Sequence, residues 1–138
     1  MQEFPGAACS RISPDILVVE DEVLVRMLIA DILASTGLPT LEARDAEEAL
    51  AEVTQRQKRP RVLVTDINLG RGMDGVAFAA LMQQRWPELP VVYVTANPDR
   101  LEGRKLGPHE RLVPKPFDID DLIVTIRRLV ASATTPTH

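Results

Sequence analysis

The stretch Val62-Leu63-Val64-Thr65-Asp66 is a continuous apolar run that ends at a carboxylate. Short runs of this kind, rich in β-branched residues and without polar alternation, are typical of parallel strands whose two faces are both covered by helices. Two equally apolar runs and two weaker ones predict four further strands: Ile16-Leu17-Val18-Val19, Val91-Val92-Tyr93-Val94-Thr95, Thr40 to Ala43 and Arg111 to Val113.

Segments with a helical period separate these strands. The first helix is expected to end at Gly37, and its inward stripe is predicted to be Val25, Leu28, Ile29, Ile32 and Leu33. The last helix is expected to start after Asp118, with an inward stripe of Ile119, Leu122, Ile123, Ile126, Leu129 and Val130. A second helix is expected after Asp45 as N-cap, with Ala46, Ala49, Leu50 and Val53 on one stripe. A third is expected from Gly75 to about Arg85, and a short polar fourth helix between Pro98 and Leu106.

Five strands alternating with five helices predict an α/β fold, a doubly wound parallel sheet in a three-layer α/β/α arrangement. Right-handed crossovers and the size of the chain favour the flavodoxin-like strand order 2-1-3-4-5. The 138 residues suffice for one domain with its own apolar core, and we expect no second domain. This domain is expected to span residues 14–131, between flexible tails at 1–13 and 132–138 that are small, polar and without periodicity.

Composition argues against several functional classes. The 16 basic and 20 acidic residues give a net charge of −4, and the basic residues are dispersed, so direct binding to nucleic acid is not expected. The longest apolar stretch, Val76 to Met82, is far shorter than a membrane span, so no membrane partner is expected. The amino terminus lacks the features of a secretory signal, which favours a cytoplasmic location. The single cysteine, Cys9, cannot form an internal disulfide.

Polar residues stand where the predicted strands end. Glu20 and Asp21 follow the first strand, Asp66 the third and Thr95 the fourth, while Lys115 lies in the loop after the fifth. In a doubly wound sheet the ligand site lies beside the carboxyl ends of the first and third strands, so these residues should converge there. Three carboxylates held close together repel one another, and a divalent cation would remove the conflict. Mg²⁺ suits such ligands, together with a phosphoryl oxygen.

The same residues suit phosphoryl transfer. A carboxylate can act as a nucleophile and form an aspartyl phosphate, and Asp66 is central and opposite the acidic pair. Thr95 would offer a hydroxyl donor and Lys115 a mobile cation to the phosphoryl oxygens. Taken singly, each residue has an ordinary interpretation as a helix cap, a strand residue or a solvated charge. Their joint placement at the ends of four strands is what indicates a site.

Four segments together resemble the receiver domain of two-component response regulators, the CheY-like family, over roughly residues 14–131: Ile16-Leu17-Val18-Val19-Glu20-Asp21-Glu22, Val64-Thr65-Asp66-Ile67-Asn68-Leu69 with Met73-Asp74-Gly75, Val94-Thr95-Ala96, and Val113-Pro114-Lys115-Pro116-Phe117. The resemblance implies that Asp66 accepts a phosphoryl group from a phosphohistidine of a sensor histidine kinase or a histidine phosphotransfer protein. It also implies a Mg²⁺ site made by Glu20, Asp21, Asp66 and the backbone carbonyl of Asn68.

By the same resemblance, Thr95 hydrogen-bonds the phosphoryl group, Lys115 pairs with it, and the Lys115-Pro116 bond is cis. The family usually has an aromatic switch residue three positions before the lysine, where this chain has Leu112. We therefore expect that Tyr93, on the preceding strand, could move instead.

The loop after Asp66 is one residue longer than the family's common spacing and contains a G-x-G-x-x-G pattern, Gly70-Arg71-Gly72-Met73-Asp74-Gly75. A dinucleotide site is not expected, because the pattern follows the third strand and Asp66 would repel a pyrophosphate. No acidic residue ends the following strand to bind a ribose hydroxyl. Asn68 and Asn97 flank the expected path of an attacking water and are predicted to help set the autodephosphorylation rate.

Three functional hypotheses remain open. The first is a stand-alone receiver that is not an enzyme but a phosphoacceptor with self-catalysed phosphorylation and dephosphorylation. The second is a Mg²⁺-dependent phosphatase or phosphotransferase, and the third is a degenerate receiver that acts only as a binding module. In the first, Val23, Leu24 and Met27 of the first helix would dock the phosphodonor. For a stand-alone receiver, in which no effector domain follows the fifth helix, we expect a downstream protein to bind the surface made by the fourth helix, fifth strand and fifth helix.

Overall fold

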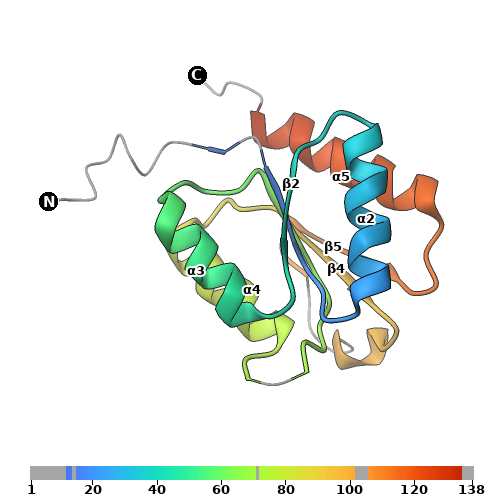
Figure 1. Ribbon diagram of the computed structural model, residues 1–138, viewed down its shortest axis with the longest axis horizontal. Helices are drawn as coiled ribbons and strands as arrows, with labels where there is room; N and C mark the ends of the chain where they lie inside the picture. The colour runs from blue at the N-terminus through green and yellow to red at the C-terminus, as the bar shows by residue number, and fades with distance from the viewer. Residues whose placement is uncertain (1–11, 14, 71, 102–105, 135–138) are drawn as a thin grey trace, which may run out of the picture.

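The structure is a computed structural model that describes residues 12–13, 15–70, 72–101 and 106–134 (Figure 1). Its middle layer is a five-stranded parallel sheet with the order β2-β1-β3-β4-β5, which confirms the predicted topology. The strands are β1 (Ile16–Val19), β2 (Thr40–Ala43), β3 (Val62–Thr65), β4 (Val91–Thr95) and β5 (Glu110–Pro114). In the centre of the sheet, Ile16 of β1 is paired with Thr40 on one side and Val62 on the other.

Helices cover both faces of the sheet, as the fold class requires (Figure 1). On one face lie α3 (Ala46–Arg56) and α4 (Gly75–Arg85), and on the other lie α2 (Val23–Ser35) and α5 (Ile119–Thr134). In the place of the fourth predicted helix the described residues form a 3-10 helix, η1 (Pro98–Leu101), and residues 102–105 lie outside the described residues.

Local signals in the sequence explain where helices begin and end. The side chains of Asp45 and Asp74 accept hydrogen bonds of 2.8 Å from the backbone N–H groups of Glu48 and Ala77, so each aspartate caps the first turn of its helix. Gly37 has a φ of +82°, the left-handed conformation that glycine adopts without strain after a helix.

The core consists of two apolar clusters, one on each face of the sheet. Because successive strand residues point to opposite faces, a sheet covered on both sides needs apolar residues at every position. Accordingly, every residue of β1, β3 and β4 is buried. Leu17 and Leu63 pack towards α3 and α4, whereas Ile16 and Val64 pack towards α2 and α5.

Three residues predicted to face inward are exposed: Leu28 (45%), Leu50 (37%) and Ile119 (44%). In α2 the buried residues are Ile29, Ala30 and Leu33, and Leu28 precedes Ile29 by about 100° of helix rotation. Leu50 follows the buried Ala49 by the same rotation. Ile119 is the first residue of α5, one turn before Leu122, the first residue of that helix to be buried.

Residues 12–13 and 132–134 of the predicted tails fall within the described residues. Ile12 forms an isolated parallel bridge with Arg59, and the backbone N–H of Ser13 donates to the carbonyl of Arg59 at 2.7 Å. At the other end α5 continues to Thr134, so residues 132–134, predicted as part of a flexible tail, belong to the last helix. The remaining residues of the predicted tails, 1–11 and 135–138, lie outside the described residues. No helix in the described ranges is both long and apolar enough to cross a membrane.

Candidate functional site

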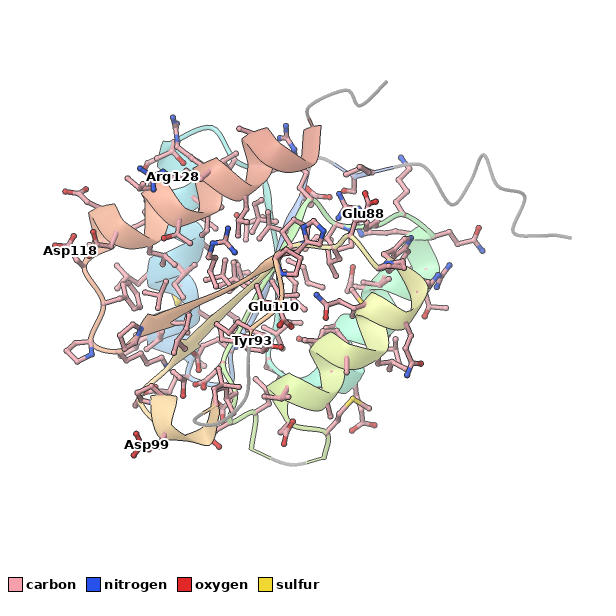
Figure 2. All side chains as sticks on the ribbon, turned by 180° about the vertical axis from the view of Figure 1, so that it is seen from behind. Glu88, Tyr93, Asp99, Glu110, Asp118 and Arg128 are labelled. Carbon is pink, nitrogen blue, oxygen red and sulfur yellow. The ribbon has the colours of Figure 1, made fainter. Side chains whose placement is uncertain are left out.

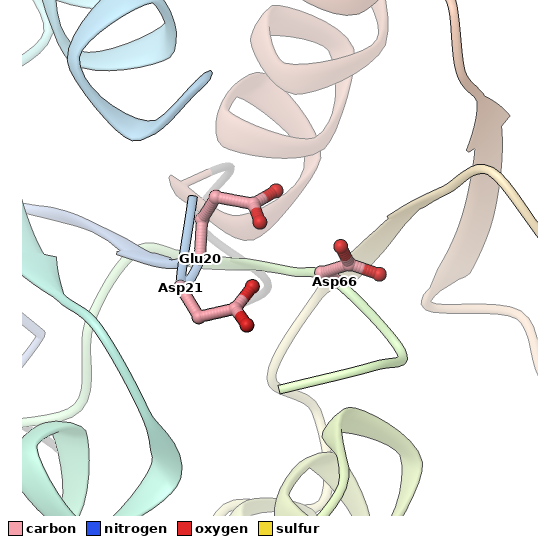
Figure 3. Close-up of side chains that lie close together, drawn as sticks. All are labelled: Glu20, Asp21 and Asp66. Carbon is pink, nitrogen blue, oxygen red and sulfur yellow. The ribbon is translucent and has the colours of Figure 1, made fainter. Parts of the chain in front are cut away.

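Three carboxylates meet at the carboxyl edge of the sheet. Glu20 and Asp21 follow β1, and their side chains extend towards Asp66, which follows β3 (Figure 3). Each residue offers a carboxylate oxygen, and these atoms all lie within 4.8 Å of one another. Glu20 and Asp66 are buried, with 1% and 8% of their surface exposed, whereas Asp21 is exposed to solvent.

The sheet itself fixes these residues, because its hydrogen bonds continue one position beyond the strands. The backbone N–H of Asp66 donates to the carbonyl of Val19 at 3.1 Å, and that of Glu20 donates to the carbonyl of Ala43 at 3.0 Å. The backbone N–H of Asn68 donates to Oδ1 of Asp66 at 3.0 Å. The acidic residues are thus placed by the ends of three adjacent strands.

Lys115 supplies the positive charge of the site. Its Nζ lies 2.9 Å from Oε1 of Glu20 and 3.0 Å from Oδ2 of Asp66, and 3.7 Å from Oε1 of Glu22. The backbone N–H of Lys115 donates to the carbonyl of Thr95 at 2.7 Å, which attaches this loop to the end of β4. The Lys115-Pro116 bond is cis, as the resemblance implied.

Burial and charge shift the protonation equilibria of two of these groups. Burial, with a further contribution from the charge of Asp66, raises the pKa of Glu20 to about 7, although the hydrogen bond from Lys115 opposes the shift. For Lys115, burial acts to lower the pKa, but the hydrogen bonds to Glu20 and Asp66 outweigh it and the pKa is raised. Lys115 is therefore a stable cation between acidic groups.

Thr95 lies at the same edge, at the end of β4. It is fully buried, and its hydroxyl oxygen accepts a hydrogen bond of 3.0 Å from the backbone N–H of Asn97. The hydroxyl hydrogen remains available to a further acceptor, because a hydroxyl group accepts and donates at once. Asn97 is exposed and Asn68 is half-buried.

The expected movement of Tyr93 meets a structural obstacle. Tyr93 is fully buried, and its hydroxyl donates to Oε2 of the buried Glu110 at 3.2 Å (Figure 2). The other carboxylate oxygen of Glu110 accepts from the backbone N–H of Gly107 at 2.8 Å. Leu112, which pairs with Tyr93 across the sheet, is half-buried against the same apolar cluster. Tyr93 is thus held inside the core.

Gly75 and Arg26 support the site through contacts that were not predicted from the sequence. A Cβ on Gly75 would overlap the backbone carbonyl oxygen of Asp66, and the Gly75 N–H donates to the carbonyl of Ile67 at 2.7 Å. Glycine at the first position of α4 therefore lets that helix begin directly against Asp66. Arg26 donates to the backbone carbonyl of Glu20 at 2.8 Å. The glycine directly after Asp74 was a signal that could have indicated the contact of Gly75 with Asp66, whereas no local sequence pattern indicates the contact of Arg26 with Glu20.

The donor set fits Mg²⁺. This ion prefers oxygen ligands in octahedral geometry and is usually held by one or two carboxylates with several waters. Glu20, Asp21 and Asp66 provide carboxylate oxygens at the required proximity, and the exposed side of the cluster at Asp21 leaves access for water. The role of the Asn68 carbonyl remains a prediction from the resemblance.

Comparison with known proteins places this geometry in context. Residues 16–127 match the family model of the response regulator receiver domain. The chain is 35% identical over 117 residues to the DNA-binding transcriptional regulator NtrC of Salmonella typhimurium, an alignment covering 83% of this chain and 24% of that protein. It is 36% identical over 118 residues to the nitrogen assimilation regulatory protein NtrX of Azorhizobium caulinodans, covering 83% and 25%. The chain thus spans about a quarter of the length of these curated relatives.

Solved structures agree with this assignment. The receiver domain of NtrX from Brucella abortus matches with a TM-score of 0.75 at 37% identity, covering 86% of this chain and 99% of that one. The receiver domain of the hybrid histidine kinase CckA matches with a TM-score of 0.71 at 28% identity, covering 84% and 98%. Together with the strand order and the acidic edge, the family match over residues 16–127 shows that the chain belongs to the response regulator receiver domains of two-component systems.

Proposed function

We propose that Asp66 is the phosphoacceptor of this receiver domain and that the donor is a phosphohistidine of a sensor histidine kinase or a histidine phosphotransfer protein. Receiver domains of two-component systems accept phosphoryl groups from histidine kinases. The observation that carries the assignment to Asp66 is its position: one oxygen is held by the Asn68 N–H and the other by Lys115, beside two further carboxylates. Transfer forms an oxygen–phosphorus bond at Asp66 and breaks the phosphorus–nitrogen bond of the donor, whose imidazole leaves.

The residues around Asp66 would stabilise the transferred group by charge and by orientation. Glu20, Asp21, Asp66 and the Asn68 carbonyl would hold Mg²⁺, which when bound neutralises charge on phosphoryl oxygens. Lys115, already in contact with Asp66, would pair with a phosphoryl oxygen, and the buried Thr95 would donate its hydroxyl hydrogen to another.

Dephosphorylation would occur in the same site, by attack of water on the phosphorus. A phosphatase of small substrates normally needs a second carboxylate near the nucleophile as general acid or base, and this chain has Asn68 two residues after Asp66. We therefore treat the protein as a self-dephosphorylating acceptor, with Asn68 and Asn97 affecting the rate, and place this reaction in the cytoplasm.

The output would be a change in binding to another protein. Phosphorylation adds about −1.5 to −2 charges to an acidic site, and Thr95 and Lys115 are the groups that can respond. Both connect to β5 and the segment before α5, because the Lys115 N–H is bonded to the Thr95 carbonyl. A downstream protein that recognises the surface around η1, β5 and α5 would then prefer one of two conformations. The DNA-binding named for NtrC belongs to that longer protein.

Intact mass spectrometry after incubation with acetyl phosphate and Mg²⁺ tests the proposal. The wild type should gain the mass of one phosphoryl group, and D66N should gain none. D31N, which removes an exposed carboxylate on α2, is the matched control and should be labelled like the wild type. Sustained hydrolysis of acetyl phosphate with no accumulated adduct would support an enzyme instead, and a wild type that is never labelled would support a binding module.

A further inference from the structure

The glycine pattern in the loop between β3 and α4 is not accounted for by phosphoryl transfer. Gly70 and Gly72 both have left-handed backbone angles, with φ of +73° and +76°. In this region glycine is unstrained and residues with a Cβ are disfavoured. The two positions thus have the same backbone requirement, and they differ in what surrounds them.

Gly70 faces the acidic site. A Cβ placed on Gly70 would lie 3.2 Å from Oδ2 of Asp21, closer than ordinary van der Waals contact. A Cβ on Gly72 would lie 3.8 Å from Oε1 of Glu47, an ordinary contact away from the three carboxylates. A side chain at position 70, unlike one at 72, would therefore press on a carboxylate of the site.

Asp21 is the carboxylate most easily displaced. Glu20 and Asp66 are both buried and both bonded to Lys115. Asp21 is exposed, and within the part of the chain that the structure describes no hydrogen bond or ion pair holds its side chain. Its position therefore depends on the space that the neighbouring backbone leaves for it.

We propose that Gly70 is a positioning residue for Asp21, and that its missing side chain lets Asp21 serve as a ligand of Mg²⁺. The inference rests on the metal site of the proposed function. A Cβ at position 70 displaces the Asp21 carboxylate by a few tenths of an ångström. Mg²⁺ requires near-ideal octahedral geometry, whereas Ca²⁺ accepts irregular geometry and variable distances. The substitution thus weakens Mg²⁺ binding more than Ca²⁺ binding.

Calorimetric titration of the wild type, G70A and G72A with Mg²⁺ and separately with Ca²⁺ tests this inference, below the unfolding temperature of all three proteins. G72A is the matched control, because it introduces the same left-handed alanine without a close contact to Asp21. G70A should bind Mg²⁺ about tenfold more weakly than G72A, the lower end of the effect of disturbing groups that support metal ligands. Its affinity for Ca²⁺ should change less, and the unfolding temperatures of the two variants should be similar.

Equal Mg²⁺ affinities in G70A and G72A would overturn the inference. An equal loss of Mg²⁺ and Ca²⁺ affinity in G70A would also overturn it, because that result indicates general damage to the loop. A wild type that binds no Mg²⁺ would refute the metal site of the proposed function itself.

Discussion

Glu20 and Asp66 are two buried carboxylates that share one cation, the ammonium group of Lys115. Nζ of Lys115 lies within 3.0 Å of one oxygen of each acid, and Glu20 and Asp66 are buried. A single cation between two carboxylates leaves an excess of negative charge, which a buried acid can remove by binding a proton. The raised pKa of Glu20, the more buried of the two acids, indicates that Glu20 binds this proton.

The first prediction concerns pH and stability without Mg²⁺. Folding raises the pKa of Glu20 from 4.5 to about 7, so the folded state holds this proton more tightly than the unfolded state. The resulting stabilisation is fully present below pH 4.5 and is lost as the pH rises through 7. In urea unfolding with a chelator present, the free energy of unfolding of the wild type should fall relative to that of E20Q over this range, by on the order of 2 kcal/mol. Parallel pH profiles for the two proteins would contradict this expectation.

At the scale of helices and strands, much of the fold could be predicted from the sequence because apolar pattern and caps are local signals. The strand Thr40–Ala43 and the helix Gly75–Arg85 have their predicted bounds, and Asp45 caps its helix as expected. The prediction of the inward side of α2 was wrong at Leu28. The reason is that α2 is apolar around more than half of its circumference, so periodicity alone does not select the buried stripe.

The residues of the candidate site that follow directly after strands could be predicted from the sequence, because the ends of the strands could be predicted. Glu20, Asp21, Asp66 and Lys115 come together because the strand order brings their strand ends together. The contact between Gly75 and the Asp66 carbonyl, and the burial of Tyr93 against Glu110, depend on distances between elements. No pattern along the chain records such distances, so these features needed the structure.

The second prediction concerns the surface of α2. Leu24 is 81% exposed, and Val23 and Met27 beside it are also exposed, which leaves an apolar face next to the acidic site. If the phosphodonor docks there, L24R should slow phosphotransfer from a cognate histidine kinase by about tenfold or more, the cost of losing one central interface residue. Labelling by acetyl phosphate should be unchanged, because that donor needs no docking face.

L81R is the control for this experiment, because Leu81 is an exposed leucine on α4, which packs on the opposite face of the sheet. It should leave both rates unchanged. If L24R slows phosphorylation by acetyl phosphate as much as phosphotransfer from the kinase, the substitution disturbs the site itself and the docking role is wrong.

At the scale of the whole molecule, the site joins both apolar cores. Val19, whose carbonyl receives the Asp66 N–H, packs in the cluster beneath α3 and α4. Lys115 follows β5, whose Val113 packs in the cluster beneath α2 and α5. Unfolding of either side therefore disperses the carboxylates, so an ion that binds them together binds the folded chain and stabilises all of it.

The last prediction follows from this linkage. An ion that binds the folded state alone raises the free energy of unfolding by RT ln(1 + [L]/Kd), about 1.4 kcal/mol at ten times its Kd. The single tryptophan, Trp86, is buried at the end of α4 and reports global unfolding by fluorescence without touching the site. Addition of Mg²⁺ should raise the stability of the wild type and of D31N by this amount and should raise that of D66N much less. If D66N gains as much as the wild type, Mg²⁺ acts elsewhere on the surface and Asp66 is not one of its ligands.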